Sequence, residues 1–129
     1  MKIMVTGDRG YIGSVLVPML ISKNYSVVGY DAGYFAENFL EDVDENYIKI
    51  TKDIRDISDE DLDGVDGIIH LAGLSNDPLG ELSPKLTEDI NYHGTMHLAE
   101  LAKKTGVSRF VYASSQSMYG ISNTDSELE

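Results

Sequence analysis

The feature that most constrains this chain is the segment "TGDRGYIG" (6–13), where three glycines stand three residues apart directly behind a short apolar run. A glycine inside a helix or strand costs roughly 0.5–1 kcal/mol relative to alanine, because its backbone loses more freedom on folding. Such a cluster at the end of a first strand therefore indicates that bare backbone is needed at that corner. Glycine lets a ligand or another backbone segment approach without meeting a Cβ atom.

Short apolar segments alternate with helical patterns along the rest of the chain. Strands are predicted at 2–6, 26–30, 47–51, 66–72 and 109–114. Helices are predicted at about 10–23 and 84–105, a short acidic helix follows 53–56, and 32–46 is assigned to a loop. This order predicts one α/β domain over residues 1–129, a Rossmann-type doubly wound parallel sheet with strand order 3-2-1-4-5. Ligands bind such sheets at the carboxyl ends of the strands.

Both helices have sequence signals for their ends and faces. In the first, the apolar residues at helical spacing are Ile12, Val15, Leu16, Met19 and Leu20, and Pro18 predicts either a kink or a shifted boundary. In the second, Ser83 and Pro84 form a typical start and Gly106 a typical end. Its expected apolar face consists of Leu86, Ile90, Leu98 and Leu101.

Composition excludes several classes of function. The formal net charge is −12, from 22 acidic and 10 basic residues, which disfavours binding to nucleic acid. There is no cysteine, so disulfides, thiolate metal sites and thiol catalysis are excluded. The sequence has no apolar run of membrane-spanning length and no signal-peptide pattern at its start, and we expect a cytoplasmic protein that contacts no membrane.

Two features together predict a dinucleotide site. A helix that begins near Gly10 would direct its unpaired N–H groups and positive dipole end at a diphosphate, although a glycine-rich turn without a ligand has the same pattern. Asp31 follows the second predicted strand, 18 residues after Gly13. A carboxylate there can accept both hydroxyl hydrogen bonds of an adenosine ribose and repels a 2′-phosphate, which favours NAD over NADP. An exposed loop aspartate is the alternative.

Six motifs in order resemble one protein family. They are "TGDRGYIG" (6–13), Asp31, "DIRD" (53–56), "HLAG" (70–73), "NYHGT" (91–95) and "SSQSMYG" (114–120). Together they resemble the extended short-chain dehydrogenase/reductases, in particular the NAD-dependent nucleotide-sugar epimerase/dehydratase group. The resemblance spans essentially the whole chain. It implies that the chain is the NAD-binding portion of an oxidoreductase that transfers a hydride transiently on a nucleotide sugar.

The resemblance also implies roles for individual residues. The diphosphate would lie on Gly7, Gly10 and Gly13 and near backbone groups of Arg9, Tyr11 and Ile12. Asp31 would hold the adenosine ribose, and Asp53 and Ile54 would flank the adenine, whose amino group would donate to the Asp53 carboxylate. Leu71, Ala72 and Gly73 would pass beneath the central part of the cofactor, and Ser114 would stand at its nicotinamide end. Ser115 occupies the catalytic Ser/Thr position of the family, where its hydroxyl would donate to the sugar oxygen being oxidised.

Other parts of the family pattern are absent from this sequence. None of the eight tyrosines has lysine four positions later, the pair that serves the family as acid/base catalyst, and Tyr119 is followed there by Asn123. We therefore expect the chain by itself to bind NAD weakly and to turn over little. The catalytic helix and the substrate-binding part would cover the fourth and fifth strands, so their absence predicts self-association into a homo-oligomer. In the positions where 4,6-dehydratases of the family have an acid pair, this sequence has Gln116 and Ser117, which leaves epimerase or simple dehydrogenase chemistry favoured.

Several residues have structural interpretations beside functional ones. His93 and His97 have metal-ligand spacing, but no third ligand is evident and we predict no metal site. His70 is interpreted as a hydrogen-bonded core histidine, Gly94 as a site of close helix packing, and Asn91 as a brace for the active-site backbone or a water. Two alternatives stand for the whole chain: a non-catalytic NAD(P)-binding module that senses cofactor or acts through a partner, and a partial gene product with no independent role.

Overall fold

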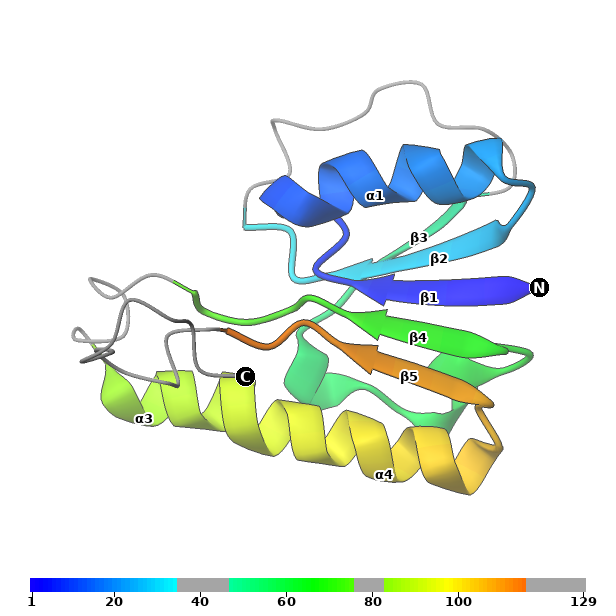
Figure 1. Ribbon diagram of the computed structural model, residues 1–129. Coiled ribbons are helices and arrows are strands. Elements are labelled where there is room, and N and C mark those ends of the chain that lie inside the picture. The colour runs from blue at the N-terminus through cyan, green and yellow to red at the C-terminus, as the bar shows by residue number, and fades with distance from the viewer. Residues whose placement is uncertain (35–46, 76–82, 116–129) are drawn as a thin grey trace, which may run out of the picture.

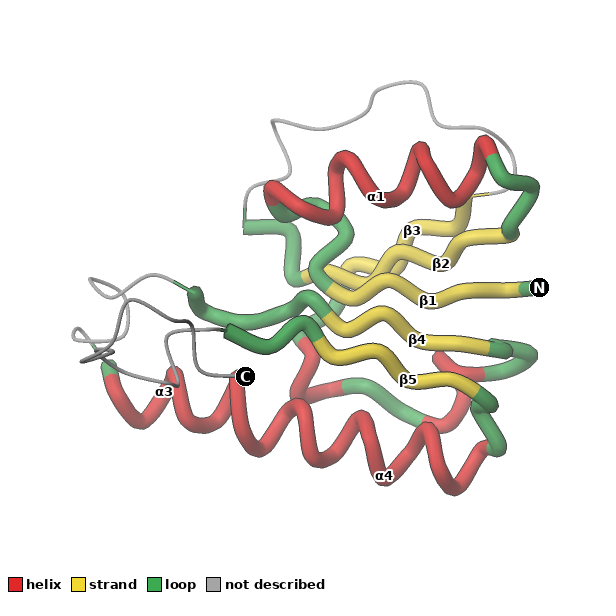
Figure 2. The backbone as a smooth tube through the Cα atoms, viewed as in Figure 1, coloured by secondary structure: helices red, strands yellow, loops and turns green. Residues whose placement is uncertain are grey.

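The computed structural model describes residues 1–34, 47–75 and 83–115. Five parallel strands form one sheet in the order β3-β2-β1-β4-β5. Their bounds are β1 (Lys2–Thr6), β2 (Ser26–Asp31), β3 (Tyr47–Thr51), β4 (Gly67–His70) and β5 (Arg109–Tyr112). All five carboxyl ends lie at one edge of the molecule, at the left in Figures 1 and 2. The predicted fold class and strand order are confirmed.

The helices cover the two faces of the sheet. Helix α1 (Tyr11–Ser22) lies on one face, and the helix formed by α3 (Pro84–Glu88), η4 (Asp89–Gly94) and α4 (Thr95–Thr105) lies on the other (Figure 1). Two 3-10 helices, η2 (Ile54–Asp56) and η3 (Asp59–Leu62), take the place of the expected acidic helix. Within the described residues, no helix combines the length and the apolar composition that a membrane crossing requires.

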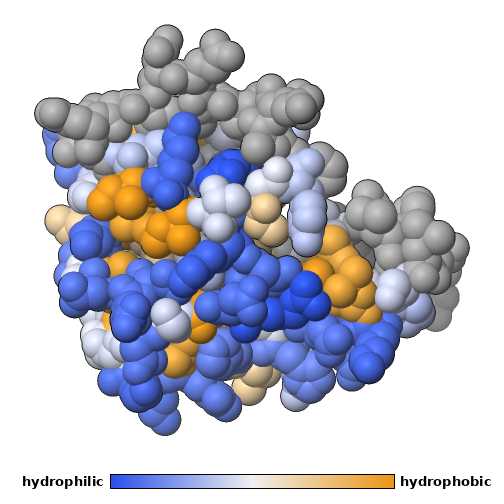
Figure 3. All heavy atoms as spheres, turned by 180° about the vertical axis from the view of Figure 1, so that it is seen from behind, coloured by the Kyte–Doolittle hydropathy of each residue, from blue (hydrophilic) through white to orange (hydrophobic). Residues whose placement is uncertain are grey.

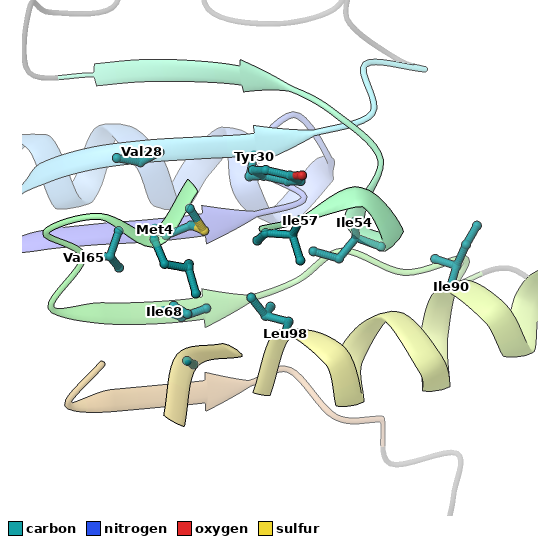
Figure 4. Packing of buried hydrophobic residues seen from close by; sticks show 11 residues of the cluster. Met4, Val28, Tyr30, Ile54, Ile57, Val65, Ile68, Ile90 and Leu98 are labelled. Carbon is teal, nitrogen blue, oxygen red and sulfur yellow. The ribbon is translucent and has the colours of Figure 1, made fainter. Parts of the chain in front are cut away.

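Side chains of the central strands point alternately to the two faces of the sheet, and each face has its own hydrophobic core. Ile3 and Val5 point to the α1 side, where they pack with Val17, Leu20 and Val27. Met4 points to the other side, into a larger cluster with Tyr30, Ile68 and Leu98 among others (Figure 4). The face in Figure 3 is mostly hydrophilic, with apolar side chains in separate patches.

Helix α1 forms where it was predicted, but its buried face differs from the prediction. Leu20 is buried and Leu16 is partly buried against the core, as predicted, whereas Ile12, Val15 and Met19 are more than half exposed and Gly13 and Val17 are buried instead. The reason is the close approach of Gly13 to the first loop: a Cβ on Gly13 would lie 2.4 Å from the Gly7 carbonyl oxygen. This contact sets the rotation of α1, and Val17 and Leu20 follow Gly13 onto the sheet. The helix also continues through Pro18 without a break.

The second predicted helix is confirmed in its bounds and corrected in its interior. The Ser83 hydroxyl accepts from the Leu86 N–H at 3.4 Å, Pro84 begins the helix, and Gly106 ends it in the left-handed conformation at φ 83°. Residues 89–94 form a π-helical segment that periodicity did not predict. On the expected apolar face, Ile90 and Leu98 are buried but Leu86 is 38% exposed, because it lies in the first turn, ahead of the contacts with the 3-10 helices.

Candidate functional site

The glycine loop after β1 is built so that backbone packs directly on backbone. Gly7 has φ 71°, which a side chain rarely adopts, and a Cβ there would lie 2.8 Å from the backbone nitrogen of Ala72. The Gly10 N–H donates to the Gly7 carbonyl at 3.0 Å, and Gly13 approaches the carbonyl oxygens of Gly7 and Asp8. The three glycines therefore close a tight turn between β1, α1 and the loop after β4.

The start of α1 fits an anionic group. Gly10 precedes the helix in extended conformation, and no side chain caps the helix or places an acid in its first turn. The first N–H groups of such a helix lack intrahelical acceptors and carry its positive dipole end. Tyr11 and Ile12 are 90% and 59% exposed, so the first turn of the helix is open to solvent. This corner can accept a diphosphate.

Asp31 ties the glycine loop to the end of β2. Its Oδ1 accepts from the Gly33 N–H at 2.7 Å, and its Oδ2 accepts from the Arg9 N–H at 3.3 Å. The carboxylate is partly exposed and has lone pairs left for further donors. Asp31 thus stands beside the glycine loop with its position set from two sides.

A buried carboxyl beneath the loop was missed by sequence reasoning. Asp8 is 1% exposed, its Oδ2 accepts from the Tyr47 hydroxyl, and a Cβ on Gly29 would collide with that oxygen. Burial raises the pKa of Asp8, with Asp31 adding to the rise, while the Tyr47 hydrogen bond and Arg9 act in the opposite direction. Burial and the Asp8 carboxyl raise the pKa of Tyr47. The one sequence signal was Gly29 in the interior of a strand, which indicates a close approach.

Asp53 and Ile54, the two residues expected at the adenine, both have partners within the protein. The Asp53 carboxylate accepts from the Arg55 backbone N–H at 3.0 Å and from its guanidinium at 2.7 and 2.9 Å, and this pairing lowers the pKa of Asp53. Ile54 is buried in the larger core, so its side chain packs inward. The Asp53 carboxylate also caps η2, a structural role that was not predicted beside its expected hydrogen bond with the adenine amino group.

The loop after β4 is held by side chains from both neighbours. The Ala72 N–H donates to Thr6 Oγ1 at 3.3 Å. Asn91 brackets Leu74, accepting from its N–H at 2.8 Å and donating to its carbonyl at 2.9 Å. A Cβ on Gly73 would lie 3.2 Å from Asn91 Oδ1. Asn91 thus braces this backbone, as the sequence suggested. Leu71 and Ala72 lie beside the glycine loop, since a Cβ on Gly7 would meet both, and Gly73 follows them against Asn91.

Each of the three histidines contacts groups of the protein itself. His70 is fully buried, with Nδ1 2.6 Å from Thr6 Oγ1 and Nε2 2.8 Å from Thr95 Oγ1, as expected for a core histidine, and burial lowers its pKa to about 4. His97 Nε2 lies 3.0 Å from the Ile57 carbonyl oxygen, and the His93 ring lies edge-on to Tyr92. Gly94 is also a packing site, because a Cβ there would lie 3.1 Å from Ile54.

Ser114 and Ser115 follow Ala113 at the end of β5 and are exposed. The Ala113 N–H donates to the His70 carbonyl at 3.1 Å, so the chain continues alongside the end of β4 before it reaches these serines. They therefore lie at the same edge of the sheet as the glycine loop. Gln116, Ser117 and Tyr119 lie outside the described residues.

Comparison with known proteins shows which family shares this sequence and fold. Residues 3–129 match the model of the NAD dependent epimerase/dehydratase family. The UDP-glucose 4-epimerase of Mycolicibacterium smegmatis is 35% identical over 93% of this chain and 41% of its own length. The UDP-N-acetylglucosamine 4-epimerase from Methanobrevibacter ruminantium, solved with UDP-N-acetylmuramic acid, matches with TM-score 0.88 and 27% identity, over 96% of this chain and 41% of that one. The Thermus thermophilus UDP-glucose 4-epimerase complex with NAD matches with TM-score 0.76 and 26% identity, over 90% and 38%. The chain thus spans about two fifths of these relatives.

Proposed function

Because this chain belongs to the NAD dependent epimerase/dehydratase family, we propose that it is the cofactor-binding portion of a nucleotide-sugar epimerase. The observation that carries the proposal is the uncapped start of α1, closed by three glycines and tied through Arg9 to Asp31. Diphosphate and ribose are neighbouring parts of a dinucleotide, and these two features are neighbours in the fold. The bound cofactor supplies the acceptor and donor of a hydride.

We assign NAD rather than NADP on the charge at the ribose position. Asp31 would accept hydrogen bonds from the ribose hydroxyls, and its negative charge opposes a 2′-phosphate. Gly7, Gly10 and Gly13, with the backbone of Arg9, Tyr11 and Ile12, would hold the diphosphate. The backbone of Asp53 and Ile54 would face the adenine, because the Asp53 carboxylate is paired with Arg55 and the Ile54 side chain is in the core.

At the opposite end, Leu71, Ala72 and Gly73 would support the central part of the cofactor, and Ser114 its nicotinamide end. The Ser115 hydroxyl would donate to the sugar oxygen that loses its proton, a fixed donor where charge develops. Gln116 and Ser117 in place of an acid pair favour epimerisation over 4,6-dehydration. Since the sequence has no Tyr-x-x-x-Lys, we propose that these 129 residues bind NAD without turnover by themselves.

Calorimetric titration of the chain with NAD⁺ and with NADP⁺ tests the proposal. We expect saturable binding of NAD⁺, weakened in Asp31→Ala and unchanged in Asp63→Ala, an exposed carboxylate ahead of β4 at the amino ends of the strands. Absence of binding of either dinucleotide at millimolar concentration, by a chain that is folded by circular dichroism, would refute the proposed function.

A further inference from the structure

The carboxyl of Asp8 is buried beneath the glycine loop, and only one of its two oxygens is bonded. Its Oδ2 accepts from the Tyr47 hydroxyl. Its Oδ1 is also buried, and no group among residues 1–34, 47–75 and 83–115 forms a hydrogen bond with it. A carboxylate oxygen that has lost its water and gained no donor costs free energy. This arrangement therefore disfavours the ionised form of Asp8.

The fold makes room for this carboxyl and fixes its position. Gly29 lies inside β2, and a Cβ there would come within 2.5 Å of Asp8 Cγ and 2.8 Å of the Tyr47 ring. Burial and the Asp8 carboxyl raise the pKa of Tyr47, so its hydroxyl keeps its proton and remains a donor. An oxygen of a carboxylate and the carbonyl oxygen of a carboxylic acid both accept hydrogen bonds. The Asp8 side chain can therefore stay in place in either protonation state.

The charged groups around Asp8 act on it in opposite directions. Burial has the largest effect and raises the pKa of Asp8, and Asp31 at the end of β2 adds to the rise, while the Tyr47 hydrogen bond and Arg9 oppose it. On β3, Lys49 Nζ lies 5.3 Å from the centroid of the Tyr47 ring. The first turn of α1 has no acidic side chain and directs its positive dipole end toward the loop. Opposing influences of this kind make the protonation of Asp8 sensitive to any charge added at the loop.

A dinucleotide would add such a charge. Asp8 stands between Gly7 and Gly10, and its carbonyl oxygen would lie 2.5 Å from a Cβ on Gly13, so it belongs to the same turn as the start of α1. A bound diphosphate is negative and repels a carboxylate in this turn. It also occupies the helix dipole end that stabilises the carboxylate when the site is empty. Both effects favour the neutral acid in the complex.

We propose that Asp8 is a positioning residue of the dinucleotide site and that its carboxyl takes up a proton from solvent as the diphosphate binds. The inference rests on the proposed function, because it requires a diphosphate at the glycine loop. The proton forms an O–H bond at Oδ1, Oδ2 keeps the hydrogen bond from Tyr47, and the negative charge of the carboxylate is lost. The loop then stays anchored to β3 with no like charge beneath the diphosphate.

Calorimetric titration with NAD⁺ across a pH series tests this inference. The complex binds the Asp8 proton more tightly than the free chain does, so a lower pH favours binding until the free chain is protonated as well. We expect the affinity to rise about tenfold between about pH 8 and about pH 5, which corresponds to a difference of about one pKa unit between the complex and the free chain. Titrations in two buffers of different ionisation enthalpy measure the proton uptake directly, and circular dichroism checks the fold at each pH.

Asp8→Asn removes the titrating group and keeps an acceptor for the Tyr47 hydroxyl. We expect this variant to bind NAD⁺ at high pH about as tightly as the unmodified chain does at low pH, with neither the rise in affinity nor the proton uptake. Asp63→Asn is the matched control, because Asp63 is an exposed carboxylate ahead of β4 at the amino ends of the strands. It should keep both.

Tyr47→Phe gives an independent measurement. Its hydrogen bond lowers the pKa of Asp8, so its removal should shift the rise in affinity to higher pH. Tyr25→Phe is the matched control, since Tyr25 and Tyr47 both pack against the core on the α1 side. It should leave the pH profile unchanged. This comparison decides the matter where Asp8→Asn does not fold.

The outcomes separate the inference from the proposed function. If NAD⁺ binds with an affinity that does not depend on pH, or if folded Asp8→Asn keeps the rise and the proton uptake, the role of Asp8 is refuted and the dinucleotide site stands. With Asp8→Asn unfolded, equal profiles for Tyr47→Phe and Tyr25→Phe refute it in the same way. If NAD⁺ binds to no folded variant, both proposals are refuted. A rise and a proton uptake that disappear in Asp8→Asn and persist in Asp63→Asn support the inference.

Discussion

Replacement of Gly7 by alanine should be among the most damaging small changes in this chain, and Gly106→Ala is its matched control. Both glycines have positive φ, 71° and 83°. A residue with a Cβ loses roughly 1–2 kcal/mol in this conformation. A Cβ on Gly106 would meet nothing within 4 Å, so Gly106→Ala should cost that amount and no more.

At Gly7 the same conformational cost is joined by an overlap. The added Cβ would lie 2.8 Å from the Ala72 nitrogen and 2.9 Å from the Leu71 carbonyl carbon, and both are backbone atoms that cannot rotate away. Overpacking of this kind costs about 1–3 kcal/mol, so the total for Gly7→Ala is about 2–5 kcal/mol. That is a large share of the roughly 5–15 kcal/mol by which a domain is stable.

Urea unfolding followed by far-ultraviolet circular dichroism measures both variants. The midpoint should fall further for Gly7→Ala than for Gly106→Ala, by the equivalent of about 1–3 kcal/mol at an unchanged slope. Equal losses in the two variants would mean that the contact between the glycine loop and the loop after β4 is not as close as described. The explanation of Gly7 by backbone approach would then be wrong.

Two further predictions concern pH and association. Burial lowers the pKa of His70 from its ordinary value of 6.5 to about 4. Between these two pH values the ring stays neutral in the folded protein and binds a proton in the unfolded chain. The free energy of unfolding should therefore fall as the pH is lowered from about 6.5 to 4, by about 3 kcal/mol in total. In His70→Asn this part of the pH dependence should disappear from a series of urea titrations, and a slope that persists unchanged would assign it to other groups. Val111 and Tyr112 are 56% and 53% exposed on β5, and we expect sedimentation at tens of micromolar to show self-association that Val111→Lys weakens. A clean monomer of the unmodified chain would contradict this expectation.

Much of the fold could be predicted because its signals are local. The central strands are apolar runs bounded by polar or glycine residues, β3 alternates apolar and polar residues, and alternation with helices leaves few topologies for a parallel sheet. The ends of the second helix were also predictable, since Ser83, Pro84 and Gly106 act through their own backbone neighbours. The π-helical segment 89–94 had no such signal, because periodicity alone does not distinguish it from α-helix.

The site was predictable as a set of positions and not as a set of contacts. Asp31 and the three glycines were found from their spacing. The pairing of Asp53 with Arg55 and the anchoring of Arg9 on Thr51 were not, because hydrogen bonds of long side chains depend on which acceptors the fold brings within reach. The rotation of α1 was likewise misjudged, since both apolar rows of that helix have helical spacing.

The sequence by itself determined the order of the elements, the need for bare backbone at Gly7 and Gly13, and an acid at the end of the second strand. These follow from periodicity and from the missing Cβ, which act within a few residues. Only the tertiary structure decided that Asp8 lies against Gly29 and Tyr47, and that His70 joins Thr6 to Thr95. Those partners are 21 to 64 residues apart in the chain. The register of the parallel strands, which pairs Thr6 with both Tyr30 and His70, places His70 beside Thr6, and the packing of α4 on the sheet adds Thr95.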